Sequence, residues 1–190
     1  MVHMGGRTRP ENSLAPSLLV SMPQLTDPNF HRTVVLLCEH GREGAFGLVL
    51  NRPTDTVAAE AVRLTPPPLR DSGITLWVGG PVEPQRGWIL MDADPDDDES
   101  VEVVGGLYLS TSPHVLRKLI ETGPSRSRVL TGYAGWAAGQ LDEEIAASAW
   151  LTADVDLDLV FDTPADQMWE ATIRRLGADP GLLQMGQGVH

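Results

Sequence analysis

The sequence predicts an α+β domain in which a strongly curved, mostly antiparallel sheet is flanked by several helices. Two observations support this fold class. Short apolar, β-branched segments follow one another through the first two-thirds of the chain, separated by turns rich in glycine and proline. Segments with helical periodicity come mainly later. Strict alternation of strands and helices would instead predict a parallel sheet.

The expected strands begin with an early hairpin. Two apolar segments flank the glycine-containing turn at residues 40–44, an arrangement typical of paired antiparallel strands. Near the end of the chain, residues 155–161 alternate apolar side chains with aspartates, which predicts a strand with one solvated face. The full set of expected strands covers residues 18–22, 33–39, 45–50, 74–78, 87–91, 101–104, 107–110, 128–134 and 155–161.

Helix signals are clearest after residue 110. Ser112 is a favourable N-cap, and Pro113 occupies the first turn, where its missing N–H costs no hydrogen bond. Gly123 is expected to end that helix. Thr54 or Asp55 is expected to cap a shorter helix upstream. The other expected helices lie around residues 140–148 and from a capping-box start at residues 163–166 to Gly177.

The length of 190 residues fits a single domain. Residues 1–12 are polar and rich in glycine and arginine, so we expect a disordered tail there and one domain over residues 13–190. No apolar run approaches the ~20 residues of a membrane span, and the tail lacks the apolar core of a signal peptide. We therefore expect a cytoplasmic protein with no membrane association.

Charge and residue types exclude several classes of function. The formal net charge is −12 and the basic residues do not cluster, so no direct nucleic-acid binding is expected. Lys118 is the only lysine, which excludes P-loop chemistry and most Schiff-base chemistry. Cys38 is the only cysteine, so the chain has no intrachain disulfide and no cysteine zinc cluster.

No metal site and no cofactor are expected from the sequence. The five histidines lack the spacing of paired metal ligands. Residues 92–102 are strongly acidic, but no register supplies the glycine and glutamate of a calcium-binding EF-hand loop. A solvated, mobile loop explains this segment better. The aspartates at 154, 156 and 158 are interpreted as a wet sheet face, with metal binding as the alternative.

Cys38 is the candidate nucleophile. On a strand, Cys38 and His40 point to the same face, so a thiolate–imidazolium pair is geometrically possible. His31, in the polar loop before that strand, is the other possible partner. A cysteine in an apolar strand is usually an unreactive small hydrophobe. A hydrolase or transferase that uses Cys38 is therefore the alternative interpretation, and a non-catalytic protein is the favoured one.

Two glycine-rich segments, residues 79–82 and 132–141, each follow an apolar strand. The second leads into a helix, and helix N-termini attract anions. It carries no lysine, serine or threonine at the positions that a phosphate-binding loop uses. We favour close backbone packing beneath Tyr133 and Trp136, and keep a pocket as a hypothesis.

A series of motifs, in order along nearly the whole chain, resembles the YqgE/AlgH family. The motifs are Ser21-Met22-Pro23, Asp27-Pro28-Asn29-Phe30-His31-Arg32-Thr33-Val34-Val35, Cys38-Glu39-His40, Gly47-Leu48-Val49-Leu50-Asn51-Arg52-Pro53, Gly79-Gly80-Pro81-Val82, Leu109-Ser110-Thr111-Ser112, and Gly132-Tyr133-Ala134-Gly135-Trp136 with Gly139-Gln140-Leu141. The resemblance implies a compact bacterial α+β fold of coiled sheets flanked by helices. Some family members are labelled transcriptional regulators because of a genetic association with exopolysaccharide production. The resemblance supplies no catalytic residues.

We therefore expect a non-enzymatic binding or regulatory protein whose partner is another protein or a small-molecule ligand. Because of the negative charge, any effect on transcription is expected to be indirect. The expected binding groove gathers polar and aromatic groups at strand ends. Its expected residues are Asn29, His31, Arg52, Gly80, Tyr133 and Trp136.

Overall fold

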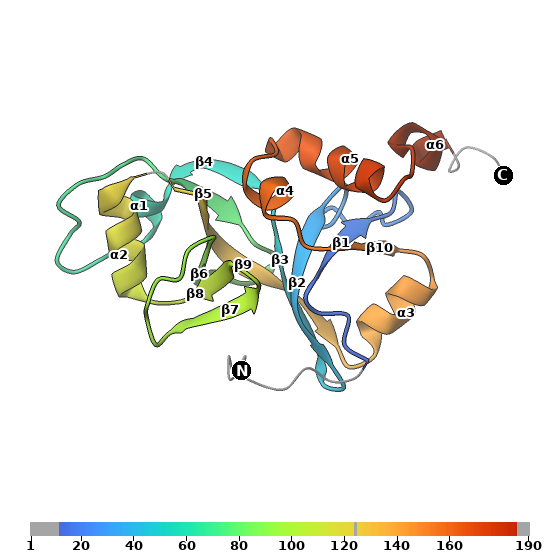
Figure 1. The fold of residues 1–190 in the computed structure, drawn as a ribbon, viewed down its shortest axis with the longest axis horizontal. Helices are drawn as coiled ribbons and strands as arrows, with labels where there is room; N and C mark the ends of the chain where they lie inside the picture. The colour runs from blue at the N-terminus through green and yellow to red at the C-terminus, as the bar shows by residue number, and fades with distance from the viewer. Residues whose placement is uncertain (1–11, 124, 186–190) are drawn as a thin grey trace.

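The computed structural model describes residues 12–123 and 125–185, which form one domain around a curled sheet (Figure 1). The expected α+β class with a mostly antiparallel, curved sheet is confirmed. The strands are β1 (Ser17–Ser21), β2 (Val34–Gly41), β3 (Gly44–Val49), β4 (Pro53–Val57), β5 (Thr75–Val78), β6 (Val82–Met91), β7 (Ser100–Val104), β8 (Leu107–Ser110), β9 (Ser127–Ala137) and β10 (Trp150–Ala153). The helices are α1 (Ala58–Ala61), α2 (Pro113–Thr122), α3 (Gln140–Ala146), α4 (Leu157–Phe161), α5 (Ala165–Arg175) and α6 (Pro180–Met185).

Strands β1, β2 and β3 form the most deeply buried part of the sheet. Their apolar residues follow one another without a polar face, so both faces must be covered. Leu36 belongs to the apolar cluster that includes Val160 of α4 and Trp169 of α5. Leu37, on the opposite face, belongs to the cluster that includes Leu141 of α3. The sheet is therefore sandwiched between α4–α5 and α3, as Figure 1 shows.

Strand β9 joins the two halves of the sheet. Its first part pairs with β6 and β5, and its last part pairs with β3. The main strand order is β10-β1-β2-β3-β9-β6-β8-β7, with β4 attached through β5. Within the described part of the chain, β5 with β9 is the only parallel pair. The glycine-rich segment expected as a turn after residue 134 therefore continues the strand to Ala137.

Helix α2 forms as the sequence predicts. Ser112 caps it, because its hydroxyl accepts a hydrogen bond from the backbone N–H of Val115. Pro113 begins the helix and Gly123 ends it. Its apolar side faces a third cluster on β5, β6 and β9. The buried residues of that side are Val115, Leu116, Leu119 and Ile120.

Near the C-terminus one assignment was wrong and one helix was missed. Residues 155–161 do not form a strand, because the Asp156 carboxylate caps α4 by accepting a hydrogen bond from the N–H of Leu159 at 3.0 Å. The strand that completes this edge of the sheet is β10, directly before it, which pairs with β1. Helix α6, after Gly177, was also not expected.

Two expected caps do not form. The segment after Asn51 is strand β4, and the hydroxyl of Thr54 donates to the carbonyl of Leu76 at 2.7 Å instead of capping a helix. Helix α1 begins after Val57 with no side-chain cap. At α5 the N-cap is Pro164, so the expected capping box is absent. At β4 a side chain that suits a cap therefore makes a tertiary contact instead.

The structure does not describe the two ends of the chain. Residues 1–11 of the expected tail, and residues 186–190, lie outside the described residues, so the boundary between tail and domain stays a prediction. In residues 12–123 and 125–185, no helix has both the length and the apolar character needed to cross a bilayer.

Candidate functional site

The two glycine-rich segments meet backbone to backbone. A Cβ atom on Gly80 would lie 2.1 Å from the carbonyl carbon of Tyr133, and one on Gly132 would lie 2.2 Å from the carbonyl oxygen of Gly80. Gly79 lies between two strands: its N–H donates to Thr131 and its carbonyl accepts from Val49, both at 2.8 Å. The segments therefore converge in space, as close packing and not as a pocket.

Tyr133 and Trp136 lie on opposite faces of β9. The Tyr133 ring packs 5.2 Å from Phe46, in the cluster beneath α4 and α5. Trp136 packs on the α3 side between Phe30 and Trp150, with ring-centroid distances of 6.3 and 6.0 Å. Only 6% of Trp136 is exposed. The expected groove that would combine these two aromatic residues with Gly80 is therefore not formed.

Glu144 of α3 holds the aromatic cluster in place. One carboxylate oxygen accepts from the indole N–H of Trp136 at 2.9 Å and from that of Trp150 at 2.8 Å. The other oxygen accepts from the Gln140 side chain at 3.0 Å. Half-buried acceptors that satisfy two indole donors stabilise packing. Trp136 therefore acts as part of the core.

The loop at residues 27–33 presents Asn29 and His31 to solvent. Asn29 donates its N–H to the carboxylate of Asp27 at 2.9 Å, which forms a local turn. The guanidinium of Arg52 donates to the carbonyl of His31, and burial lowers the pKa of Arg52. Arg52 therefore contacts the backbone of this loop at His31.

Asn51 and Thr33 fix the end of this loop. The Asn51 side chain donates to the carbonyl of Arg32 at 2.9 Å and accepts from the N–H of Val34 at 3.1 Å. Thr33 donates its hydroxyl to the carbonyl of Phe30 at 2.9 Å. These contacts keep Arg32 at a φ of 52°, a left-handed conformation that few side chains adopt.

Arg32 and Trp169 form one wall of a cleft. The guanidinium carbon lies 4.7 Å from the centroid of the Trp169 ring, and Nη2 donates to Glu170 at 3.0 Å. The indole N–H of Trp169 donates to the carbonyl of Ser21 at 2.8 Å, which fixes the ring against β1. The cleft has a volume of about 200 Å³. It is lined by Ser21, Met22, Pro23, His31, Arg32, Trp169 and Gln184.

His31 is the residue of the expected site that lines this cleft. The sequence motif that contains His31 also contains Arg32, so the neighbouring cation was within reach of sequence analysis. Trp169 was assigned to the inner face of its helix, and it is indeed buried. Gln184 lies on the unexpected helix α6, and no sequence signal placed it beside the loop.

Cys38 and His40 do not form a pair. A β-bulge between Leu37 and Glu39 makes Cys38 an extra residue, so His40 faces the side of Ala45 while Cys38 packs against the opposite cluster. Burial, with a contribution from the charge of Glu39, raises the pKa of the Cys38 thiol well above its ordinary value. The expectation that both side chains point the same way was wrong.

Both ring nitrogens of His40 are engaged. Nδ1 accepts from the N–H of Leu14 at 3.0 Å, so Nε2 carries the proton and donates to Asp142 at 3.1 Å. Among residues 12–123 and 125–185, no group of three or more His, Cys, Asp or Glu side chains is arranged to hold a metal ion. The cleft at Arg32 is the candidate site developed below.

The fold and the cleft define a single-domain α+β protein with a small polar site beside α5. The AlgH-like family model matches residues 18–181. The chain belongs to the AlgH-like family. A UPF0301 protein from Myxococcus xanthus is 40% identical over 185 residues, which cover 94% of this chain and 99% of that protein. A UPF0301 protein from Ralstonia nicotianae is 41% identical over 184 residues, covering 94% and 95% of the two chains.

Solved structures agree with this assignment. The solution structure of the AlgH protein from Pseudomonas aeruginosa matches with a TM-score of 0.76 and 38% identity, over 94% of this chain and 96% of that one. A crystal structure of a protein from Corynebacterium diphtheriae matches with a TM-score of 0.67 and 24% identity, over 94% and 93% of the chains, and shows the fold alone.

Proposed function

We propose that the protein is a non-enzymatic binding protein that takes the anionic group of a small ligand, a carboxylate or a phosphate, into the cleft beside Arg32. The observation that carries this proposal is the conformation of Arg32. A non-glycine residue with a positive φ persists only where its surroundings fix it, and such residues concentrate at functional sites. Here the surrounding hydrogen bonds hold the loop, and the guanidinium lies at the cleft wall.

The chemistry of the wall favours an anion. A guanidinium has five N–H donors, and Arg32 directs Nη2 to Glu170. Its remaining donors suit a planar carboxylate or a phosphate. His31 and Gln184 add polar groups at the rim. The net charge of −12 opposes the approach of an anion at long range, so the donors of Arg32 that Glu170 leaves over supply the local attraction.

The size of the cleft sets the size of the bound group. A volume of about 200 Å³ equals the liquid volume of roughly seven water molecules. It is below the range of about 300–1,000 Å³ of sites that enclose drug-sized ligands. The cleft therefore accommodates a small metabolite, or the charged end of a longer molecule such as a peptide.

The regulatory part of the proposal follows from binding. With a net charge of −12, an effect on transcription would pass through the ligand or a protein partner and not through DNA contacts. The proposed location is the cytoplasm. Catalysis by Cys38 gains no support, since His40 faces the other side of the sheet and burial raises the pKa of the thiol.

Metabolite retention by the immobilised protein tests the proposal. Wild type, Arg32→Gln and Arg42→Gln would be incubated with the small-molecule fraction of a bacterial extract, and the bound compounds analysed by mass spectrometry. Arg42→Gln is the matched control because it removes the same charge from the exposed turn between β2 and β3. We expect an acidic compound retained by wild type and Arg42→Gln and lost from Arg32→Gln.

A second variant separates ligand loss from loop damage. Gln184 is exposed, so Gln184→Trp fills the cleft from α6 without disturbing the loop. We expect the same loss of the acidic compound with an unchanged melting temperature. Equal retention of all compounds by the four proteins would contradict the proposal.

A further inference from the structure

Helix α2 lies at the opposite end of the molecule from α6 (Figure 1). Its apolar side is buried, while His114 and Lys118 are exposed. Two loops flank this helix: the one at its N-terminal end is strongly acidic, and the one at its C-terminal end carries Arg63, Arg70 and Asp71. Together these two loops and the exposed side of the helix are called the α2 surface.

The loop at the C-terminal end of α2 displays a large apolar side chain. Leu69 is 90% exposed, although its own backbone N–H is fixed by a hydrogen bond to the Glu121 carboxylate at 2.9 Å. Ser72 donates its hydroxyl to the carbonyl of Ile120 at 2.7 Å, and Arg117 donates to Pro66. The helix thus holds this loop at several points, and Leu69 is presented on a fixed support.

Charged residues of both signs lie near Leu69: the Glu121 carboxylate binds its N–H, and Asp71 is exposed two residues further on. Arg70 follows Leu69 in the chain, and Lys118 lies on the exposed side of the helix. Neither side chain makes a hydrogen bond or an ion pair with another described residue. Arg117 pairs with Glu121, so Arg70 and Lys118 outnumber Asp71 among the remaining exposed charges here. An exposed apolar side chain on a supported loop with a charged rim is typical of an interface anchor.

The loop at the N-terminal end of α2 is acidic. The cap residue Ser112 donates its hydroxyl to the carboxylate of Asp97 at 2.9 Å, and the N–H of Thr111 donates to the carbonyl of Glu99 at 3.3 Å. These bonds place the acidic loop against the start of the helix. Asp98 and Glu99 are exposed there. The α2 surface is therefore strongly negative at one end and weakly positive at the other.

We propose that the α2 surface binds a second copy of this chain in a symmetric dimer with the two α2 helices antiparallel. In that orientation the Leu69 loop of each copy meets the acidic loop of the other, so both contacts form at once, as a two-fold axis requires. The 10 residues of α2 span about 15 Å, which sets the separation of the two contacts. Antiparallel alignment alone pairs opposite charges at both ends.

The net charge of −12 opposes association at long range, and screening decides how strongly. At an ionic strength of about 0.15 M the Debye length is about 8 Å, shorter than the helix, so direct contacts across the interface outweigh the repulsion between distant charges. A charge-dominated contact of this kind gives a weak, reversible dimer. The occupant is the same chain because its own surface supplies both halves of the charge pattern.

A charge-swap experiment by sedimentation velocity tests the proposal with the full chain. Variant one is Arg70→Glu/Lys118→Glu, and variant two is Asp98→Lys/Glu99→Lys. Each variant reverses the sign of one partner in the proposed charge pairs between Arg70/Lys118 and Asp98/Glu99. We expect wild type to show a concentration-dependent species of twice the monomer mass, and each variant alone to remain monomeric. An equimolar mixture of the two variants should restore the dimer, because the introduced acidic side chains of one variant then face the introduced lysines of the other.

Controls keep the outcome decisive. Arg42→Glu changes charge far along the chain from the α2 surface and should dimerise like wild type. Leu69→Ser should weaken the dimer without changing the melting temperature, since the side chain is exposed. Monomeric wild type at every concentration would overturn the proposal and leave Leu69 to a partner of different sequence. A mixture that stays monomeric, or variants that dimerise alone, would overturn it equally.

Discussion

Replacement of Gly132 by alanine tests the packing that joins the two halves of the sheet. Gly132 has a φ of 74°, and an added Cβ would lie 2.2 Å from the carbonyl oxygen of Gly80. The oxygen belongs to the backbone of Gly80, and the position of a Cβ is fixed by its own backbone, so no side-chain rotation relieves the overlap. Strand β9 and the Gly79–Gly80 segment must move apart, or the variant must not fold.

The expected loss of stability follows from two contributions. Alanine in a left-handed conformation costs about 1–2 kcal/mol. Separation of the segments weakens the hydrogen bonds that Gly79 makes with Thr131 and Val49, each contributing about 0.5–1.5 kcal/mol. The free energy of unfolding should therefore fall by about 2–5 kcal/mol, out of a typical total of about 5–15 kcal/mol. For a chain of this length, the melting temperature should fall on the order of 5–20 °C.

Urea denaturation followed by tryptophan fluorescence measures this loss. Gly87→Ala is the matched control, because Gly87 pairs with Thr131 on the neighbouring strand and a Cβ there meets nothing within 4 Å. We expect the control to stay within about 1 kcal/mol of wild type. If Gly132→Ala changed stability no more than the control does, the account of the glycine contact would be refuted.

Three further predictions concern other parts of the fold. Glu144→Ala should lower the free energy of unfolding by about 2–5 kcal/mol in urea, because the indole N–H groups of Trp136 and Trp150 lose a charged acceptor, whereas Glu144→Gln should cost less; equal losses would contradict this. Cys38 should react slowly with a thiol reagent at neutral pH in the native protein and rapidly in denaturant, since burial raises its pKa; rapid native labelling would contradict the burial. The hydrogen bonds that the backbone of α4 and the Arg175 side chain donate to Asp156 lower its pKa below the ordinary 3.8. The stability that the Asp156 carboxylate contributes should therefore be complete above pH 3.8 and lost as the pH falls through the lowered pKa. Asp156→Asn should reduce the loss of stability in that acidic range, and a loss equal to that of wild type would argue against this.

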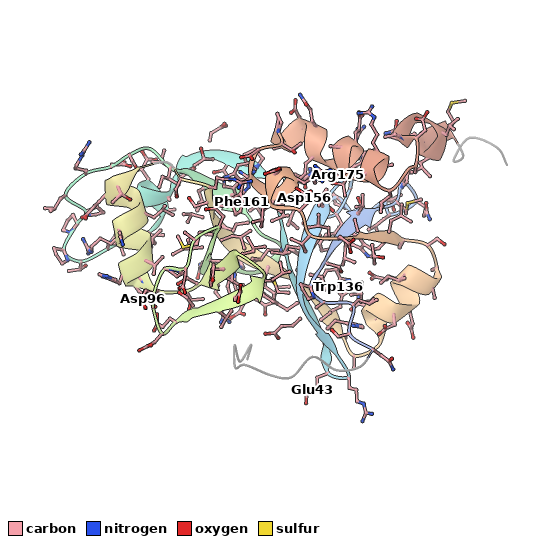
Figure 2. The ribbon with its side chains drawn as sticks, viewed as in Figure 1. Glu43, Asp96, Trp136, Asp156, Phe161 and Arg175 are labelled. Atoms are coloured by element: carbon pink, nitrogen blue, oxygen red, sulfur yellow. The ribbon has the colours of Figure 1, made fainter. Side chains whose placement is uncertain are left out.

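Much of the fold could be predicted because local signals and tertiary packing agree. The β2–β3 hairpin, with apolar residues on both sides of its turn, is an example, and Ser112 with Pro113 is another. Residues 155–161 show where the signals conflict. Alternating aspartates suit a strand, but Asp156 can also cap a helix, and the contact of α4 with the sheet decides in favour of the helix. Figure 2 shows Asp156 beside Arg175 of α5, its ion-pair partner.

The site was harder to predict than the fold. A period-two pattern placed Cys38 and His40 on one face, but a single extra residue in the strand reverses every later side chain, and no sequence signal marks that bulge. Trp136 carried an aromatic signal that fits a groove and a core equally well. The cleft depends on α6 lying near the loop at residues 27–33, a contact between distant segments that local patterns do not encode.

The most direct test of the central claim is an NMR titration of the indole N–H signal of Trp169, assigned with Trp169→Phe. Inorganic phosphate, acetate and citrate would each be added at constant ionic strength. The account predicts saturable shifts of the Trp169 indole and of the His31 and Arg32 amides, with the Trp136 and Trp150 indoles unchanged and the response lost in Arg32→Gln. Shifts that never saturate, that spread evenly over all indoles, or that persist in Arg32→Gln would contradict the claim that this cleft is an anion site.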